Sequence, residues 1–460
     1  MTLVAAGAVA TAGLAQSPTV ERPALVERQV RGDVPDAWLC SGRVAVGDHA
    51  QMTDAALADL RGLSAEHGAT VAAQAPLKWS YVWPRDASFA AAALAVAGHV
   101  EDAAQVLDFL AAVQHEDGTF EARYHPDGTP VDDGRAPQLD SSGWVLWALA
   151  AVVDAAPADE QAALTARFAV LRQRSLAAVD AAVSPDGAVR PSSDYWEVDH
   201  RSSLLLWLAV TLAGVTVVWS VVRTRLRRTR GPATGTGVTH RLRPAAAAVV
   251  VLCTSMATTT VLVTHAENRT RRPTLGTVAP LLAGARASGD DALADRLATA
   301  LDQEFAAHGY PRLSRASAMD AAVAMTSPAF LGQWPPGARD ATTRAETLLT
   351  TGAGGIRPGQ AWKDDGISWT PETALFAYAW ASDGQTDRAT TWLAWLDAHR
   401  TGNGALPEKV LADGSPAGPA PLAWTGALVV LTQAELGALL PAAEVYPQCA
   451  SLDYGAAAEG

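Results

Sequence analysis

The sequence has few of the residues from which metal and redox sites are built. Only three of its 460 residues are cysteines, at positions 40, 253 and 449, and no pair has the spacing of zinc ligands. The ten histidines are scattered, so the sequence supports no metal site and we expect no cofactor. Positive charge is also scarce, because 35 Lys and Arg stand against 48 Asp and Glu, a net charge of −13. This acidic balance argues against a nucleic-acid partner.

A convincing strand pattern and a fixed-period repeat are missing as well. Apolar residues instead recur at three- and four-residue spacing in roughly eleven or twelve segments, which predicts helices. The segments before residue 200 are 51–64, 86–98, 101–114, 140–153 and 159–182. Those after it are 275–287, 290–307, 340–351, 370–382, 385–399 and 422–438. Without a repeat an ordinary solenoid is disfavoured. Consecutive helix pairs favour an all-α toroid.

Charge is absent from two long apolar runs in the middle of the chain. Residues 203–222 hold no charged residue, and as a helix they would span about 30 Å, the thickness of a bilayer core. Residues 244–264 are also uncharged, and 223–243 hold seven arginines and no acid. The pattern predicts a two-helix transmembrane hairpin with a cytoplasmic loop. A buried hairpin in a soluble core is the alternative, against which the unpaired arginines argue.

Features near the two ends of the chain indicate where in or outside the cell the protein is expected. Residues 1–16 are apolar and end in small residues, which predicts a secretory signal or N-terminal anchor although a basic start is missing. An Ala-rich tail is the alternative. With the hairpin, this predicts a protein of the cell membrane whose folded part is extracellular, or a secreted one if the hairpin does not span. In an oxidising exterior Cys40 and Cys449 could pair, which spacing alone leaves open.

Tryptophan, in contrast, is abundant, with fifteen residues. It fills helical cores, and it is also the usual platform on which sugar rings stack. Several tryptophans fall in four segments at helix junctions that combine aromatic with charged residues. These segments are 78–86, 120–144, 191–201 and 403–425. We therefore expect the catalytic and substrate-binding residues to lie in these segments.

Carboxylates in these segments suit the hydrolysis of glycosidic bonds, which needs one protonated and one ionised carboxyl group. Glu197 follows Trp196, and because apolar surroundings raise a carboxyl pKa it suits the general acid. Glu408, in a polar Gly-rich loop, suits the base, although a surface role is equally ordinary for it. Arg85 and Asp86 open a helix after a Trp-Pro corner. They could clamp sugar hydroxyls, or Asp86 could simply cap the helix.

Four motifs carry a resemblance to a known family. They are Tyr81-Val82-Trp83-Pro84-Arg85-Asp86, Gln138-Leu139-Asp140, Asp194-Tyr195-Trp196-Glu197 and Leu406-Pro407-Glu408. Their order and spacing resemble the glucoamylase-type glycoside hydrolases, glycoside hydrolase family 15. The resemblance covers about residues 36–200 and 272–440. The Trp-x-Arg-Asp and Asp-x-Trp-Glu elements together are fairly specific, and either alone would be weak.

The resemblance implies a six-fold α/α barrel with its site at one end of the inner helices. It implies exo-acting hydrolysis of terminal α-glucosidic bonds of oligosaccharides with inversion, with Glu197 as general acid and Glu408 as general base. We expect a monomer. The residues expected to bind substrate are Trp83, Arg85, Asp86, Gln138, Asp140, Trp196 and Arg357, the last of them in a loosely matched segment.

The chain departs from the family in two places. Val198 stands where the family often has a second acid, and the predicted hairpin interrupts the domain. The expected division is 1–16 signal or anchor, 17–201 first part of the barrel, 202–270 inserted hairpin and 271–460 second part. The alternative function is a non-catalytic, membrane-held glycan-binding barrel. An enzyme that splits glycosidic bonds with phosphate is a third possibility, against which Glu408 argues.

Overall fold

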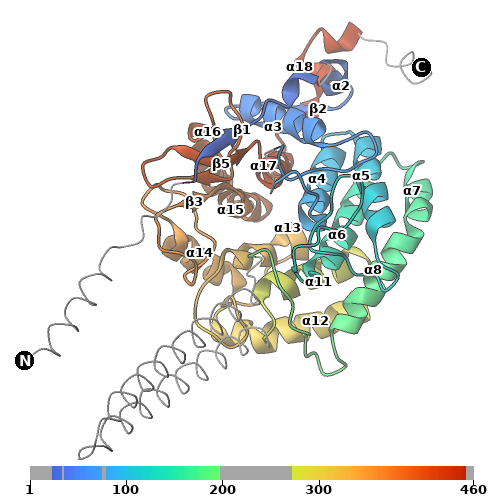
Figure 1. Ribbon diagram of the computed structural model, residues 1–460, viewed down its shortest axis with the longest axis vertical. Coiled ribbons are helices and arrows are strands. Elements are labelled where there is room, and N and C mark those ends of the chain that lie inside the picture. Colours follow the sequence, from blue (N-terminus) through green and yellow to red (C-terminus); the bar gives the residue numbers. More distant parts are fainter. Residues whose placement is uncertain (1–22, 34–35, 75–78, 197–271, 452–460) are drawn as a thin grey trace, which may run out of the picture.

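The structure is a computed structural model that describes residues 23–33, 36–74, 79–196 and 272–451. Its longer helices form two concentric rings (Figure 1). The inner ring holds α4 (Pro84–Val96), α6 (Asp140–Ala155), α11 (Leu275–Ala287), η3 (Ala321–Thr326) with α13 (Pro328–Leu331), α15 (Thr370–Ser382) and α17 (Ala423–Glu435). The outer ring holds α3 (Ala50–Leu63), α5 (Val100–Val113), α8 (Ala169–Ala182), α12 (Asp291–Glu304), α14 (Ala338–Leu349) and α16 (Thr386–Ala398).

Outer and inner helices alternate along the chain, as the α/α barrel requires. The inner ring closes because α4 packs against both α6 and α17, α6 against α11, and α15 against α17, while η3 and α13 contact both α11 and α15. It therefore draws helices from both sides of the segment 197–271. The remaining short helices are not part of either ring. They are α2 (Asp36–Cys40), α7 (Gln161–Arg167), α18 (Ala442–Val445), η1 (Arg31–Asp33), η2 (Ala306–His308) and η4 (Cys449–Ser451).

The two rings differ in sequence because they differ in burial. Every residue of α4 from Pro84 to Ala95 is buried, and the helix is rich in alanine, a strong helix former that lets helices approach closely. The outer helix α12 buries instead a stripe that includes Leu293, Leu297 and Leu301, four residues apart. One apolar face is the pattern of a helix with water on its other side.

Two glycines set the distance between α6 and α11. A Cβ atom on Gly143 would overlap the carbonyl oxygen of Pro280, and one on Gly284 would lie 2.5 Å from the carbonyl oxygen of Gly143. Backbone thus lies directly against backbone at this crossing. A side chain at either position would push the two inner helices apart.

Aromatic side chains from five inner helices fill the barrel interior. Phe89 of α4 lies 4.8 Å from Trp144 of α6 between ring centroids, and Phe330 of α13 lies 5.1 Å from the same Trp144. Tyr378 of α15 and Trp424 of α17 continue the cluster, at 5.4 Å from Phe330 and 5.8 Å from Phe89. The cluster lies between two cavities, because Trp424 lines the one at one end of the barrel and Tyr378 the one at the other end.

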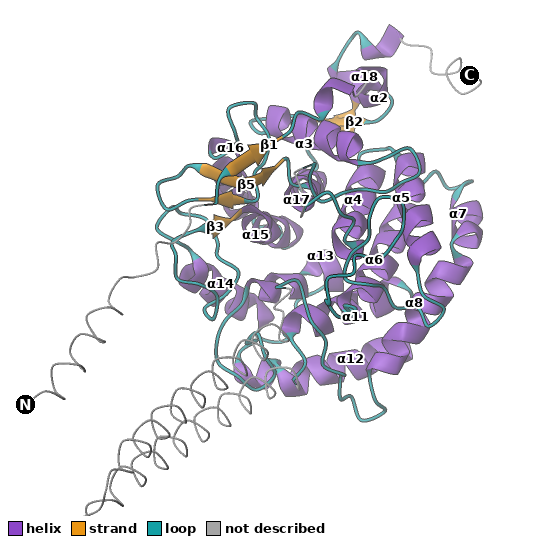
Figure 2. Cartoon of the chain, in the orientation of Figure 1, coloured by secondary structure: helices purple, strands orange, loops and turns teal. Residues whose placement is uncertain are grey.

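Beside the helices, the structure contains short strands that the sequence pattern did not predict. A four-stranded sheet, ordered β1 (Leu25–Glu27), β5 (Pro416–Ala420), β4 (Lys409–Val410) and β3 (Ser368–Trp369), lies beside α15 and α16 (Figure 2). β1 is parallel to β5, and the other pairs are antiparallel. A second sheet pairs β2 (Arg43–Ala45) with β6 (Leu439–Pro441). These strands have two to five residues, too few to show alternation in the sequence.

The expected fold class is wrong in its transmembrane hairpin. Within the described ranges, no helix is long and apolar enough to cross a membrane. The apolar inner helix α6 has 16 residues, about 24 Å of helix, and its apolar surface is covered by neighbouring helices. The runs 203–222 and 244–264, on which the hairpin was predicted, lie outside the described residues, as does the segment 1–16.

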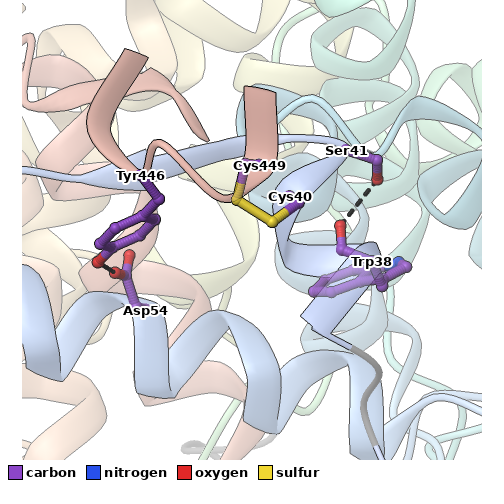
Figure 3. The surroundings of a disulfide bond; sticks show 6 residues. All are labelled: Trp38, Cys40, Ser41, Asp54, Tyr446 and Cys449. Atoms are coloured by element: carbon purple, nitrogen blue, oxygen red, sulfur yellow. Dashed lines mark hydrogen bonds between the residues drawn. A yellow bond between two sulfur atoms is a disulfide. The ribbon is translucent and has the colours of Figure 1, made fainter. Parts of the chain in front are cut away.

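The two ends of the described chain are joined by a disulfide. Cys40 at the end of α2 is bonded to Cys449 in η4, with 5.1 Å between their Cα atoms (Figure 3). This confirms the pairing that the sequence left open. Nearby, the Tyr446 hydroxyl donates a hydrogen bond of 3.0 Å to Asp54 of α3. The disulfide and this hydrogen bond thus add to the β2–β6 pairing in holding the C-terminal segment to the start of the barrel.

Reducing this disulfide is expected to lower the stability of the fold substantially. The bond joins residues 409 positions apart, so it restricts the unfolded chain over nearly its whole length. The loss of a native disulfide typically costs about 2–5 kcal/mol. Calorimetry with and without dithiothreitol should show a lower Tm in the reductant. The double variant Cys40→Ser, Cys449→Ser should show that lower Tm in both buffers, and equal Tm values for all samples would contradict the prediction.

Candidate active site

The N-terminal ends of the inner helices surround a cavity of about 230 Å³. Asp86 lies in the first turn of α4, Glu372 in the first turn of α15, and Trp424 near the start of α17. Six tryptophans form much of the wall, namely Trp79, Trp83, Trp196, Trp362, Trp369 and Trp424. The charged lining residues are Arg85, Asp86, Arg123, Arg135, Glu372, Glu408 and Lys409. The cavity is therefore both aromatic and highly charged.

Five residues predicted from the sequence meet in this cavity. They are Trp83, Arg85, Asp86, Trp196 and Glu408, which come from three distant parts of the chain. Glu197, the predicted acid, lies outside the described residues. Its neighbour Trp196 forms part of the wall. The cavity is thus built around the segments that the sequence singled out.

Gln138 and Asp140 lie behind Arg85 and hold it in place. Arg85 donates to Gln138 at 3.3 Å and to Asp86 at 3.1 Å, and its guanidinium lies 3.6 Å from the Asp140 carboxylate. Burial raises the pKa of Asp140 to about 7, against the opposing effect of Arg85. Neither Gln138 nor Asp140 is among the described residues that line the cavity. Their predicted contact with substrate stays a prediction.

Arg357 lies at the edge of the site. Its guanidinium pairs at 3.0 Å with Asp364, which is almost fully exposed. The next residue, Pro358, lines the cavity, whereas Arg357 is not among the described lining residues. Its proposed role in substrate binding also stays a prediction.

Glu408 is fixed by the small sheet that the sequence did not reveal. Its backbone N–H donates to Pro419 of β5 at 2.9 Å, and its carbonyl accepts from the N–H of Thr370 at 3.0 Å. Gly418 has φ of +76°, and a Cβ there would lie 2.5 Å from Oε2 of Glu408. The strand therefore needs glycine at this position for both its backbone conformation and its closeness to the carboxylate.

The Glu408 carboxylate is buried but has a cation beside it. Only 2% of the residue is exposed, and burial raises its pKa. The Lys409 ammonium lies 2.8 Å from Oε2 and acts in the opposite direction. Lys409 is itself placed by the Trp369 ring, whose centroid is 4.2 Å from Nζ. This pairing favours an ionised carboxylate inside an aromatic cavity, the state that a general base needs.

Glu372 is a second buried carboxyl group in the cavity, and the sequence analysis missed it. It is 3% exposed, and burial, together with the nearby Asp320 and Glu408, raises its pKa to about 8. Its Oε2 has no hydrogen-bond partner among the described residues. The sequence did hold a sign that Glu372 could be functional, because it is the one charged residue in the apolar segment 370–382. No motif marked it.

A buried ionic network supports the wall at Trp196. Arg312 donates two hydrogen bonds to Asp194, at 2.5 and 2.8 Å, and lies 3.7 Å from Asp320. The guanidinium also stacks on Trp196, 3.7 Å from the ring centroid. Tyr195 donates to Asp320, whose pKa burial raises to about 6. Asp194 therefore acts as an anchor for Arg312, and Arg312 positions Trp196.

The cavity offers hydrogen-bond donors that the described residues do not satisfy. The indole N–H groups of Trp196, Trp362, Trp369 and Trp424 are buried and have no acceptor in the described part of the chain. Buried donors normally find a partner, since leaving one unpaired costs about 1–3 kcal/mol. A ligand with several hydroxyl oxygens would supply acceptors while its ring stacked on the indoles.

Comparison with known proteins identifies the fold. No protein-family model matches the sequence, and no curated protein matches it. Among solved structures, a variant of a glycosidase has a TM-score of 0.59 at 18% identity, covering 85% of this chain and 97% of that one. A bacterial glucoamylase complexed with acarbose has a TM-score of 0.53 at 14% identity, covering 84% of this chain and 55% of that one.

A third similar structure is a mannosylglycerate hydrolase of glycoside hydrolase family 63 from Thermus thermophilus, in complex with glucose. Its TM-score is 0.50 at 15% identity, covering 83% of this chain and 99% of that one. The chain therefore has the α/α-barrel fold of glycosidases from more than one family. The likeness does not single out family 15.

Proposed function

We propose that this protein is a glycoside hydrolase, and within that class an exo-acting, inverting α-glucosidase that hydrolyses terminal α-glucosidic bonds of oligosaccharides. The observation that carries the proposal is Glu408, a buried carboxylate paired with Lys409 in a cavity walled by tryptophans. The fold, shared with glycosidases, supports the same class of reaction. The family resemblance of the motifs supports the α-glucosidic bond.

The shape of the cavity favours attack at a chain end. The cavity is small, and the aromatic cluster containing Phe89 closes the barrel beneath Trp424. A sugar would therefore enter with its terminal ring first. Arg85 and Asp86 lie in the wall and would bind hydroxyls of that ring, because their paired charges can donate and accept hydrogen bonds. Trp196 would stack on a sugar face.

The two carboxyl groups in the proposed mechanism have opposite tasks. Glu197, directly after Trp196, would protonate the leaving glycosidic oxygen. Glu408 would take a proton from water as that water attacks the anomeric carbon from the other face, which inverts the configuration. Glu197 loses one proton and Glu408 gains one, so the number of protons on the enzyme is unchanged, and proton exchange with solvent restores both groups to their starting forms.

The test of this proposal is the anomer of the released sugar. Proton NMR of reactions with maltose, isomaltose and trehalose should show β-glucose appearing first, before mutarotation. Glu197→Gln should lose turnover, and a rate equal to that of the wild type would refute its role as acid. Release of α-glucose would contradict inversion. Binding of intact oligosaccharides by the wild type without turnover would support a glycan-binding protein instead.

A further inference from the structure

The proposed mechanism leaves Glu372 without a role, although it lies inside the same cavity as Glu408. Glu372 belongs to the first turn of α15, which directly follows β3, whereas Glu408 directly precedes β4, the strand that pairs with β3. Only 3% of the residue is exposed, and its Oε2 has no partner among the described residues. A buried polar atom that lacks a protein partner, on a residue that lines a cavity, points to a ligand.

The charges around Glu372 favour its neutral form. Asp320, at the N-terminal cap of η3, and Glu408 both oppose a negative charge there. Tyr195, from the segment before residue 197, also interacts electrostatically with Glu372. Arg85 of α4 has the opposite effect, but it is shared with other carboxylates. Burial has the largest effect, and with these neighbours it raises the pKa of Glu372 to about 8.

Lys409 distinguishes the two carboxyl groups of the cavity. Its ammonium contacts Glu408 at 2.8 Å and lies over Trp369. The described part of the chain shows no ion pair for Glu372. Two buried carboxyl groups in one cavity are costly to ionise together, so the cation decides which one carries the charge.

We propose that Glu372 binds the substrate as a neutral carboxylic acid, whose hydroxyl donates a hydrogen bond to an oxygen of the sugar ring held in the cavity. This inference rests on the proposed function, because it takes the ligand to be an α-glucoside or its glucose unit. No proton is transferred to the sugar. Glu372 is thus a substrate-binding residue, and it is distinct from the acid and the base of the reaction.

The proposal makes sugar binding depend on one proton. Because only the protonated form donates, the apparent Kd equals the intrinsic Kd divided by the protonated fraction. With a pKa of about 8 that fraction is nearly one at pH 6 and roughly one tenth at pH 9. The apparent Kd should therefore rise roughly tenfold, and at pH 9 each binding event should take up close to one proton from the buffer.

Calorimetry on a variant that cannot turn over substrate measures both quantities. We would titrate Glu197→Gln with maltose, and separately with glucose, at pH 6 and pH 9 in two buffers of different ionisation enthalpy. The expected result is a roughly tenfold weaker Kd and uptake of close to one proton at pH 9, with no proton uptake at pH 6. Equal affinity at both pH values without proton uptake would overturn the inference.

Two further variants in the same background separate Glu372 from other groups. Glu372→Gln keeps the shape and a donating N–H, so its Kd should be the same at pH 6 and pH 9 and its proton uptake should vanish. Glu435→Gln is the matched control, because Glu435 lies at the C-terminal end of α17, beside the cavity at the other end of the barrel. Its pKa is also raised by burial, yet this variant should behave like the background.

Three other outcomes would contradict either the role of Glu372 or the proposed function. If Glu372→Gln keeps the proton uptake, another group is responsible and the inference is wrong. If Glu372→Gln in an otherwise wild-type chain abolishes turnover while sugar binding persists, Glu372 transfers the proton itself and its assignment as a hydrogen-bond donor is wrong. If neither maltose nor glucose binds at either pH, and no α-glucoside is hydrolysed, the proposed function fails and the inference fails with it.

Discussion

Glu408→Gln is expected to lower the turnover number for maltose by roughly 10²–10⁴-fold, the usual contribution of a general base. Glutamine has nearly the same shape, so the Gly418 contact and the aromatic wall stay intact, but the amide cannot accept the proton of the attacking water. The Lys409 ammonium also loses its countercharge, which makes the variant site more positive. Initial rates of glucose release, measured with a coupled assay, provide the test.

Controls for this variant must show that only the chemistry is lost. Glu408→Gln should still bind maltose, because its proposed role is to activate water rather than to hold the sugar. Glu435→Gln should turn over maltose at the rate of the wild type, since Glu435 is at the other end of the barrel. If Glu408→Gln retains more than a tenth of the wild-type rate, the assignment of Glu408 as base is wrong.

The helices could be predicted because their information is local: apolar residues recur at helical spacing, and turn residues separate the segments. Their arrangement in a six-fold barrel was implied by the resemblance to a known family and not by this spacing. The sheet could not be predicted in this way. Its strand β5 reads Pro-Ala-Gly-Pro-Ala, a poor strand sequence that becomes a strand because it lies between β1 and β4. Long-range pairing determined its structure, and this is the sheet that fixes Glu408.

For the predicted hairpin, local sequence predicted too much rather than too little. A window of twenty uncharged residues satisfies the length rule for a membrane span, but length and hydropathy carry no information about packing. In the described part of the chain, long apolar surface belongs to the inner helices. These are too short to cross a bilayer and are covered by neighbouring helices of both rings.

Part of the site was also beyond the reach of local motifs. Arg85, Asp86 and Glu408 stand in recognisable sequence patterns, and the structure brings them together in one cavity. Arg312 stands in no recognisable motif, because its role depends on an ion pair with Asp194, which is 118 residues away in the chain. Glu372 likewise becomes notable only when its burial and its neighbours are known. Residues that act through distant partners need coordinates to be found.

The acidic first turns of the inner helices connect fold and chemistry. Asp86, Asp140 and Glu372 stand in the first turns of α4, α6 and α15, where the helix dipole stabilises negative charge. Burial opposes this effect and raises the pKa of each group. The same end of the barrel can therefore hold both ionised and neutral carboxyl groups, depending on whether a cation is adjacent.

Arg312→Met is expected to destabilise the protein by about 3–5 kcal/mol, the cost of breaking a buried ion pair by removing one partner. Asp194 and Asp320 are 2% and 0% exposed, and both would remain in the interior without their shared cation. Trp196 would also lose the guanidinium that lies 3.7 Å from its ring centroid. Urea unfolding followed by tryptophan fluorescence should show a lower midpoint, and the affinity for maltose should fall with it.

Arg339→Met is the matched control for this variant. Arg339 pairs with Asp383 at 2.8 Å, but its side chain is 45% exposed, and surface pairs contribute only about 0–1 kcal/mol. Arg312→Lys should keep the charge yet lose the two-pronged contact with Asp194, so its stability should lie between those of the wild type and Arg312→Met. If Arg312→Met unfolds at the same urea concentration as Arg339→Met, the buried network does not support the wall of the site. Trp196 would then be placed by its other contacts, such as the edge-on packing against Trp362 at 4.8 Å between ring centroids and the hydrogen bond of 3.1 Å from its backbone N–H to Asp194.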